Sequence, residues 1–200
     1  MLNKVLNHCP VSLDQGRFTW RHNNILRHIL EVARTGLIRD DNTPIDPVIY
    51  CDLPGDTDAS VMPARPSRST IPLECTQTDL IPDLCIFWKE EKKLLILELT
   101  LPFETNLSRA HDFKRDKYAP LVSDIESNNY NVVFLPVEVG SRGFIDKENM
   151  QRLKKFVSMC SKPVSAKCFR DKLASLAIIS SFVIYSAKEE PVWECHNALS

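Results

Sequence analysis

The sequence predicts a mixed α/β domain, in which a mixed central sheet is flanked by helices and extra helices follow at the C-terminal end. Three observations support this prediction. Apolar residues recur at helical spacing over 19–37, two strand-like runs lie within 81–100, and a helix, a strand and two helices alternate after them. A chain of 200 residues with 44% hydrophobic residues suits one domain with a sizeable core.

The N-terminal part of the chain contains one strong helical pattern. Residues 1–18 show no clear periodicity, and we expect them to be irregular. Over 19–37 an apolar stripe predicts a helix, with Gly36 as its C-terminal cap. The stripe consists of Ile25, Leu26, Ile29, Leu30, Ala33 and Leu37. Residues 39–70 are rich in Pro, Asp, Ser and Thr, which predicts a long loop with one short strand at 48–53.

The centre of the chain reads as a hairpin followed by a helix. Two apolar strands within 81–100 are joined by a charged turn at Lys89–Lys92. Residues 107–128 have helical spacing, and Pro120 inside this helix is expected to kink or split it. The side chains expected to face the core from it are Ala110, Phe113, Leu121 and Ile125.

One more strand and two helices complete the predicted order. Residues 131–140 read as a strand, and 146–161 read as a basic amphipathic helix capped by Asp146. Residues 164–188 predict a longer helix. Its apolar run at 173–187 is too short for a membrane span, so we expect a buried helix.

Charge and cysteine content narrow the possible functions. The formal net charge is −1, so binding to nucleic acid would depend on local basic patches. Seven scattered cysteines without a CxxC pair indicate reduced thiols in an intracellular protein. The first residues show neither a long apolar core nor a small-residue cleavage site, so no signal peptide is expected.

Each strand of the expected hairpin carries one acid, Asp83 in the first and Glu98 in the second. If the hairpin folds about the midpoint of its turn, these two residues oppose each other, although a slip of one residue would separate them. Two close carboxylates repel each other, and a divalent cation such as Mg²⁺ would resolve the conflict. The alternative is that both acids are structural, lying at strand ends in water or paired with Lys and Arg.

These residues resemble the Pro-Asp … Glu-x-Lys signature of the restriction-enzyme-like nuclease superfamily. Pro82-Asp83 is followed by Glu98, but Thr100 stands where that signature has its lysine. The chain is more similar to the endonuclease domain of site-specific non-LTR retrotransposon polyproteins, in which a Lys-x-x-x-Tyr arrangement on the next helix supplies the lysine. Lys114 and Tyr118 match this arrangement, and helical spacing turns both toward the sheet. Lys117 is the rival candidate, and a surface lysine is the alternative for Lys114.

The resemblance implies a metal-dependent DNA endonuclease with a restriction-endonuclease-like core. It implies Asp83 and Glu98 as ligands of Mg²⁺ or Mn²⁺, with Lys114 and Tyr118 as further catalytic residues. Double-stranded DNA would be the partner and the nucleus the location, without a membrane or a small-molecule cofactor. The alternative is an inactive retrotransposon remnant that binds DNA or protein.

The resemblance also divides the chain into three parts. The core would span 16–145, and 146–200 would form a helical extension packed on it. Residues 1–15 would be the remnant of a zinc knuckle, because Cys9 matches a ligand position whereas Lys4 replaces the histidine. We therefore expect no competent zinc site there.

Other charged residues are weaker candidates. Glu31, Glu104 and Glu138 are possible supporting acids near the metal. Their alternatives are a solvated glutamate for Glu31, a helix-start residue for Glu104, and an ion pair with Arg142 for Glu138. Arg21, Lys117 and Arg142 would contact DNA, and a solvated helix face is the alternative for the helical ones.

Overall fold

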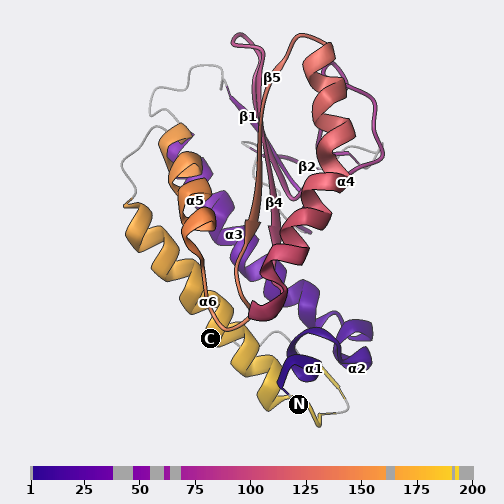
Figure 1. Ribbon diagram of the computed structural model, residues 1–200, viewed down its shortest axis with the longest axis vertical. Helices are drawn as coiled ribbons and strands as arrows, with labels where there is room; N and C mark the ends of the chain where they lie inside the picture. The colour runs from indigo at the N-terminus through magenta and orange to yellow at the C-terminus, as the bar shows by residue number, and fades with distance from the viewer. Residues whose placement is uncertain are drawn as a thin grey trace.

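The computed structural model describes residues 2–37, 47–54, 61–63, 69–160, 165–190 and 192–193. It consists of one twisted sheet with helices on both sides, which confirms the predicted mixed α/β class (Figure 1). The helices are α1 Leu2–Asn7, α2 Pro10–Asp14, α3 Arg17–Leu37, α4 Leu107–Ser127, α5 Lys147–Met159 and α6 Ala166–Ser186. The strands are β1 Val48–Cys51, β2 Val61–Pro63, β3 Leu84–Trp88, β4 Lys93–Thr100 and β5 Asn131–Glu138.

The sheet is mixed, with the strand order β2-β1-β3-β4-β5. The pairs β1–β3 and β3–β4 are antiparallel, whereas β1–β2 and β4–β5 are parallel. The parallel pair β4–β5 requires a crossover, and α4 provides it. As a result, the residues of α4 lie over the strand that carries Glu98.

The hairpin formed by β3 and β4 has the predicted register. Leu84 pairs with Leu97 and Trp88 with Lys93, so the residue numbers of each pair add up to 181. The turn at 89–92 is closed by a hydrogen bond from the Lys92 amide to the Lys89 carbonyl, with Lys92 at φ 48°. Asp83 comes one residue before β3, and continuing this register places it opposite Glu98.

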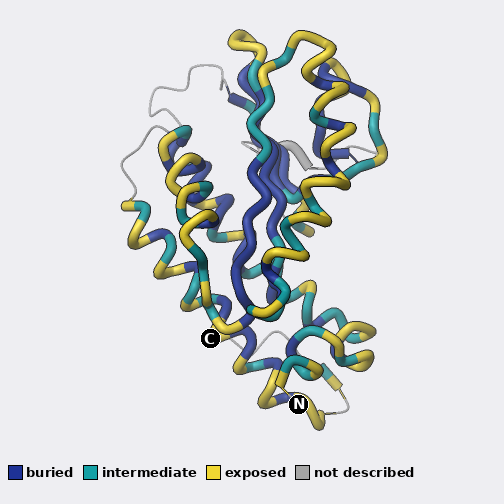
Figure 2. The backbone as a smooth tube through the Cα atoms, in the orientation of Figure 1, coloured by how far each residue is buried: buried dark blue, intermediate teal, exposed yellow. Residues whose placement is uncertain are grey.

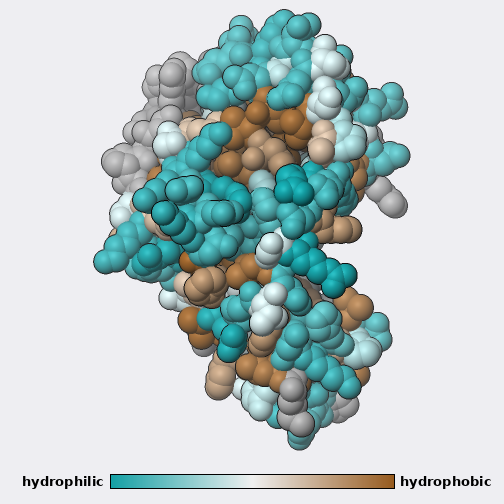
Figure 3. Space-filling view, viewed as in Figure 1, coloured by the Kyte–Doolittle hydropathy of each residue, from teal (hydrophilic) through white to brown (hydrophobic). Residues whose placement is uncertain are grey.

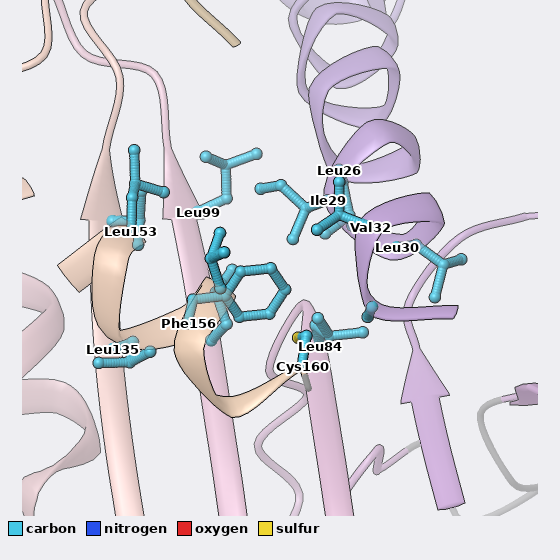
Figure 4. Close-up of a cluster of buried hydrophobic side chains, with 14 of the residues drawn as sticks. Leu26, Ile29, Leu30, Val32, Leu84, Leu99, Leu135, Leu153, Phe156 and Cys160 are labelled. Carbon is cyan, nitrogen blue, oxygen red and sulfur yellow. The ribbon is translucent and has the colours of Figure 1, made fainter. Parts of the chain in front are cut away.

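Two hydrophobic cores lie on the two faces of the sheet. On one face α3, α5 and α6 pack against leucines of β4 such as Leu95, Leu97 and Leu99 (Figure 4). On the other face α4 covers Leu94 and Ile96. Figure 2 shows the central strands buried between these layers. Glu98 belongs to the same face as Leu94 and Ile96, so it points toward α4, as the alternation along the strand predicts.

The N-terminal residues are helical, so the expectation of irregular structure there is wrong. α1 packs against α6 and α2 packs against α3. Pro10 begins α2, where its missing N–H costs nothing, and the Asn7 side chain donates to the Leu101 carbonyl at 2.8 Å. Residues 2–15 are therefore docked on the rest of the chain. The short helices lack long-range periodicity, which explains why their pattern was not visible in the sequence.

The predicted stripe of α3 is buried, but Gly36 is not a cap. It lies inside the helix, where an added Cβ would stand 2.0 Å from the carbonyl oxygen of Cys160. Gly36 thus allows the end of α5 to approach α3 closely. Residues 39–46, 55–60 and 64–68 of the expected loop lie outside the described residues. Within the described part, β1 falls at the predicted strand, and β2 was not predicted.

Two predictions about the later helices need correction. Pro120 does not split α4, which runs unbroken from Leu107 to Ser127, and Phe113 is 65% exposed and does not face the core. α6 is buried on only one side, because Ile178 and Phe182 are 52% and 68% exposed. Figure 3 shows hydrophobic side chains at the molecular surface near α1 and the end of α6. The apolar run of α6 is therefore buried on one side and exposed to solvent on the other.

The cap of α5 is confirmed, since the Asp146 carboxylate accepts a hydrogen bond from the Asn149 amide at 2.7 Å. The cysteines Cys9, Cys51, Cys75, Cys85, Cys160 and Cys168 are free thiols, whereas Cys195 lies outside the described residues. Among the residues that the structure describes, no helix combines the length and apolarity needed to cross a membrane.

Candidate functional site

Asp83 and Glu98 lie together at one end of the hairpin, and both line the same cleft. The Asp83 amide donates to Glu98 Oε2 at 3.3 Å, and the Leu99 amide donates to Asp83 Oδ2 at 2.6 Å. Each acid is thus held by the backbone of the opposite strand. The prediction that they are cross-strand neighbours is confirmed.

α4 supplies the basic and phenolic partners of Glu98. Lys114 Nζ donates to Glu98 Oε1 in a close ion pair, and the Tyr118 hydroxyl donates to Oε2 at 3.0 Å. Lys114 and Tyr118 are four residues apart, so they share the helix face that covers the sheet. Lys114 and Tyr118 therefore converge on Glu98, one of the two acids. A surface position for Lys114 is wrong, because its side chain is only 20% exposed.

His22 of α3 is a site residue that the sequence did not single out beyond a general basic surface. Its Nε2 lies 3.2 Å from Asp83 Oδ2, and its Nδ1 lies 3.2 Å from Asn23 Oδ1. The contact joins residues 61 positions apart, and no local pattern announces it. Asp52, at the end of β1, is another acid near the site, and its amide donates to the Asp83 carbonyl at 3.0 Å.

Burial and mutual charge set the protonation of these groups. Burial, followed by the negative charge of Asp83, raises the pKa of Glu98, although Lys114 and Tyr118 counteract the rise. Burial and then the charge of Glu98 raise the pKa of Tyr118 far above its usual range, so its hydroxyl remains a donor. Burial alone would lower the pKa of His22, but the hydrogen bond and charge of Asp83 outweigh it and raise the pKa.

These groups open onto a cleft of about 320 Å³. Its lining combines the acids with polar and basic side chains, namely Asn7, Phe18, Arg21, His22, Asp83, Glu98, Leu99, Thr100, Leu101 and Lys114. Thr100 lines this cleft at the position where the usual signature has lysine. The Lys114 ammonium reaches Glu98, two residues earlier on the same face, from the helix above.

Arg21 was predicted to contact DNA or to lie on a solvated helix face, but it is buried. It is 2% exposed, and its guanidinium donates to Ser181 Oγ at 3.0 Å and to the Leu101 carbonyl at 3.4 Å. Burial lowers its pKa to about 10. Arg21 therefore fastens α6 to the end of β4 at the floor of the cleft, and a contact with DNA from this position is not supported.

The other two predicted DNA contacts are at the surface. Lys117 is exposed, and its Nζ lies 4.9 Å from the ring centroid of Tyr118. Arg142 is 52% exposed, and its Nε donates to Glu104 Oε2 at 2.8 Å. Glu104 also accepts from the Arg142 amide at 2.7 Å. Glu104 is also the first residue of a short 3-10 helix, Glu104–Asn106, that leads into α4, so the alternative of a helix-start residue is confirmed. Its carboxylate in addition holds the loop after β5.

Glu138 and Glu31 lie apart from the acid pair. Glu138 is 1% exposed and accepts from Arg152 at 3.2 Å, and His111 Nδ1 lies 3.3 Å from it. The prediction that Arg142 forms an ion pair with Glu138 is wrong, because Arg152 of α5 forms this pair. Glu31 is 61% exposed and pairs with His28 at 3.3 Å, which agrees with a solvated glutamate.

The acid pair fits a hydrated divalent cation in its donor chemistry, because carboxylate oxygens are the ligands that Mg²⁺ and Mn²⁺ take. Glu98 is engaged by Lys114 and Tyr118, however, and within the described ranges no three His, Cys, Asp or Glu side chains form a ready-made metal cluster. A cation would therefore bind first at Asp83. The expected lack of a competent zinc site around Cys9 stays a prediction.

Neither the comparison with protein-family models nor the search of curated proteins finds a match to this chain. The site is therefore interpreted from its own geometry.

Proposed function

We propose that the chain is a metal-dependent DNA endonuclease domain with a restriction-endonuclease-like core, related to those of non-LTR retrotransposons. The observation that carries this proposal is the convergence of Lys114 and Tyr118 on Glu98 beside Asp83. Two acids, a lysine and a cleft form a set that phosphodiester hydrolysis requires. The proposal includes a nuclear location and double-stranded DNA as the partner.

In this reaction the oxygen of a water adds to phosphorus, one P–O ester bond breaks, and the departing oxygen takes a proton. A cation at Asp83 and Glu98 would lower the pKa of the water and offset charge on the phosphate. Lys114 would leave Glu98 to hold a phosphate oxygen or the attacking water. Tyr118 keeps its proton and orients Glu98 through a hydrogen bond of 3.0 Å.

The surroundings of the cleft favour a phosphate-bearing ligand. Lys114 and His22 are the basic side chains at the acids, and Lys117 lies exposed one turn further along α4. Phosphate contacts by lysine position nucleic acid without reading its sequence. With a net charge of −1, the chain would depend on such local contacts.

The test is the nicking of supercoiled plasmid in Mg²⁺ or Mn²⁺ by the wild type and by Asp83→Asn, Lys114→Met and Lys117→Met. We expect nicking by the wild type, a loss of about 10³-fold or more in the first two variants, and a smaller loss in Lys117→Met that comes from weaker DNA binding. Lys154→Met is the control, because Lys154 is an exposed lysine of α5 that does not line the cleft. Equal activity in all chains, or no activity in any, would refute the proposal.

A second candidate is a catalytically inactive remnant that binds DNA or protein. It is favoured by the close pairing of Lys114 with Glu98, which already offsets the charge of one acid without a cation. Calorimetric titration with Mn²⁺ separates the two candidates. A binding module requires no cation at Asp83, so its Asp83→Asn variant would bind Mn²⁺ and DNA as the wild type does.

A further inference from the structure

His22 presents one ring nitrogen to the acid that would hold the cation. The Nε2 atom lies 3.2 Å from Asp83 Oδ2, and both side chains are partly buried, with 24% and 13% exposure. Both residues line the cleft that contains Glu98 and Lys114. His22 belongs to the long helix α3, whose apolar stripe is fixed in the core. The position of the imidazole is therefore determined by the fold.

The second ring nitrogen of His22 meets an oxygen that favours one tautomer of the neutral ring. Nδ1 lies 3.2 Å from the Asn23 side-chain oxygen, and the tautomer with a hydrogen on Nδ1 makes this contact a hydrogen bond. In the neutral ring Nε2 then presents its lone pair to a carboxylate oxygen of Asp83. Two acceptors that face each other require a positive centre between them, either a proton or a cation. Metal-binding histidines commonly have this arrangement, with the other nitrogen donating to an oxygen.

The separation of the two donor atoms suits a shared cation. Neighbouring ligands of an octahedral ion with bonds of about 2.1 Å lie about 3 Å apart, close to the 3.2 Å between Nε2 and Oδ2. Glu98, by contrast, is engaged by Lys114 and Tyr118. Asp83 and His22 are thus the pair whose donor atoms already face each other, and Glu98 would join when Lys114 turns to phosphate.

We propose that His22 is a nitrogen ligand of the divalent cation at Asp83, an inference that rests on the proposed function. A nitrogen ligand distinguishes cations, because imidazole suits transition metals whereas Mg²⁺ takes oxygen ligands. The site therefore binds Mn²⁺ in preference to Mg²⁺. The substitution of His22 lowers this preference, in addition to weakening the binding of Mn²⁺.

The test is electron spin-echo envelope modulation of Mn²⁺ bound to the full chain. We expect ¹⁴N modulation from a directly bound imidazole in the wild type, which is replaced by the ¹⁵N pattern after labelling with ¹⁵N-histidine. His22→Gln and His22→Asn lose this modulation, and calorimetry shows a Kd for Mn²⁺ that is higher by about tenfold or more. His28→Gln is the control, since His28 lies on the same helix but pairs with Glu31.

The outcomes separate this inference from the proposed function. If Mn²⁺ binds in an Asp83-dependent way without ¹⁴N modulation, or if the modulation persists in both His22 variants, the inference is refuted and the proposed metal site remains. If Mn²⁺ does not bind, or binds equally in Asp83→Asn, both proposals are refuted. The use of two His22 variants, one with a longer and one with a shorter amide, maintains the test when one of them folds poorly.

Discussion

Glu98 and Glu138 lie on neighbouring strands and on the same face of the sheet, yet they are built into different surroundings. Both are buried, with 4% and 1% exposure, and burial raises the pKa of both. Each also meets α4, Glu98 through Lys114 and Glu138 through His111. The difference is the second partner. Glu98 has Asp83 and a cleft beside it, whereas Glu138 is closed off by Arg152 and Asn149 of α5.

This difference separates an acid available to a ligand from one used for structure. Arg152 Nη1 contacts both Glu138 Oε2 and Asn149 Oδ1, and the Glu138 amide donates to the same Asn149 oxygen at 2.8 Å. The cluster thus links β5 to α5. Glu98 is held by Lys114 and Tyr118 of α4 and by the Asp83 amide, but it lines the cleft, whose lining does not include Glu138. Two buried carboxylates of one sheet therefore differ in whether a ligand can reach them through a cleft.

The largest expected effect is on catalysis. Glu98→Gln is expected to reduce plasmid nicking by about 10³-fold or more, because an amide is a poor metal ligand. Glu138→Gln is expected to reduce it by less than about threefold under conditions in which both chains are folded. Initial rates in Mg²⁺ measure both. A similar loss in the two variants would show that the two acids belong to one site.

The next effect is on stability. Arg152→Met leaves Glu138 buried without its arginine partner, and we expect it to lower the free energy of unfolding by about 3 kcal/mol. Lys114→Met is expected to cost about 1 kcal/mol, because Glu98 borders a cleft that water can enter. Urea denaturation measures both. Saturating Mn²⁺ is expected to offset the loss in Lys114→Met and to leave that in Arg152→Met unchanged, and the reverse result would contradict the comparison.

A third effect is on the pH dependence of stability. Burial raises the pKa of Glu138 above the ordinary value of 4.5, so between these two pKa values the folded chain binds more protons than the unfolded chain. Stability therefore falls as pH rises from 4.5 through the folded pKa. Glu138→Gln is expected to remove this contribution. Glu148→Gln, at an exposed acid that also contacts Arg152, is the control and keeps it. Urea denaturation from pH 4 to about 7 compares them.

The smallest effect concerns Thr100, the neighbour of Glu138 across the β4–β5 pair. Its hydroxyl oxygen is buried without a hydrogen-bond partner among the described residues. Thr100→Val removes this hydroxyl and keeps the shape, so we expect stability to stay equal or to rise by less than about 1 kcal/mol. Calorimetric melting measures it. A loss of more than about 2 kcal/mol would indicate that water in the cleft satisfies the hydroxyl.

The parts of the site that local rules determine were predictable from the sequence. A tight turn fixes the register of a hairpin, so the Asp83–Glu98 pair followed from counting. Helical spacing likewise placed Lys114 and Tyr118 toward the sheet. His22 and Arg152 were missed because their contacts join distant elements, α3 with β3 and α5 with β5. Arg21 was misplaced because the sequence around it gives no sign of the buried carbonyl that it meets, which belongs to a residue 80 positions away.

The position of Lys114 affects how such sites are found. An ammonium group can reach the acids either from a strand or from the helix above it, since a long side chain spans the gap between the two layers. The lysine can therefore occupy different positions in the sequence while its nitrogen occupies about the same point relative to the acids. A search that demands a lysine two residues after the glutamate passes over Thr100 and discards this chain. A search for the spatial grouping of two carboxylates and one ammonium group retains it.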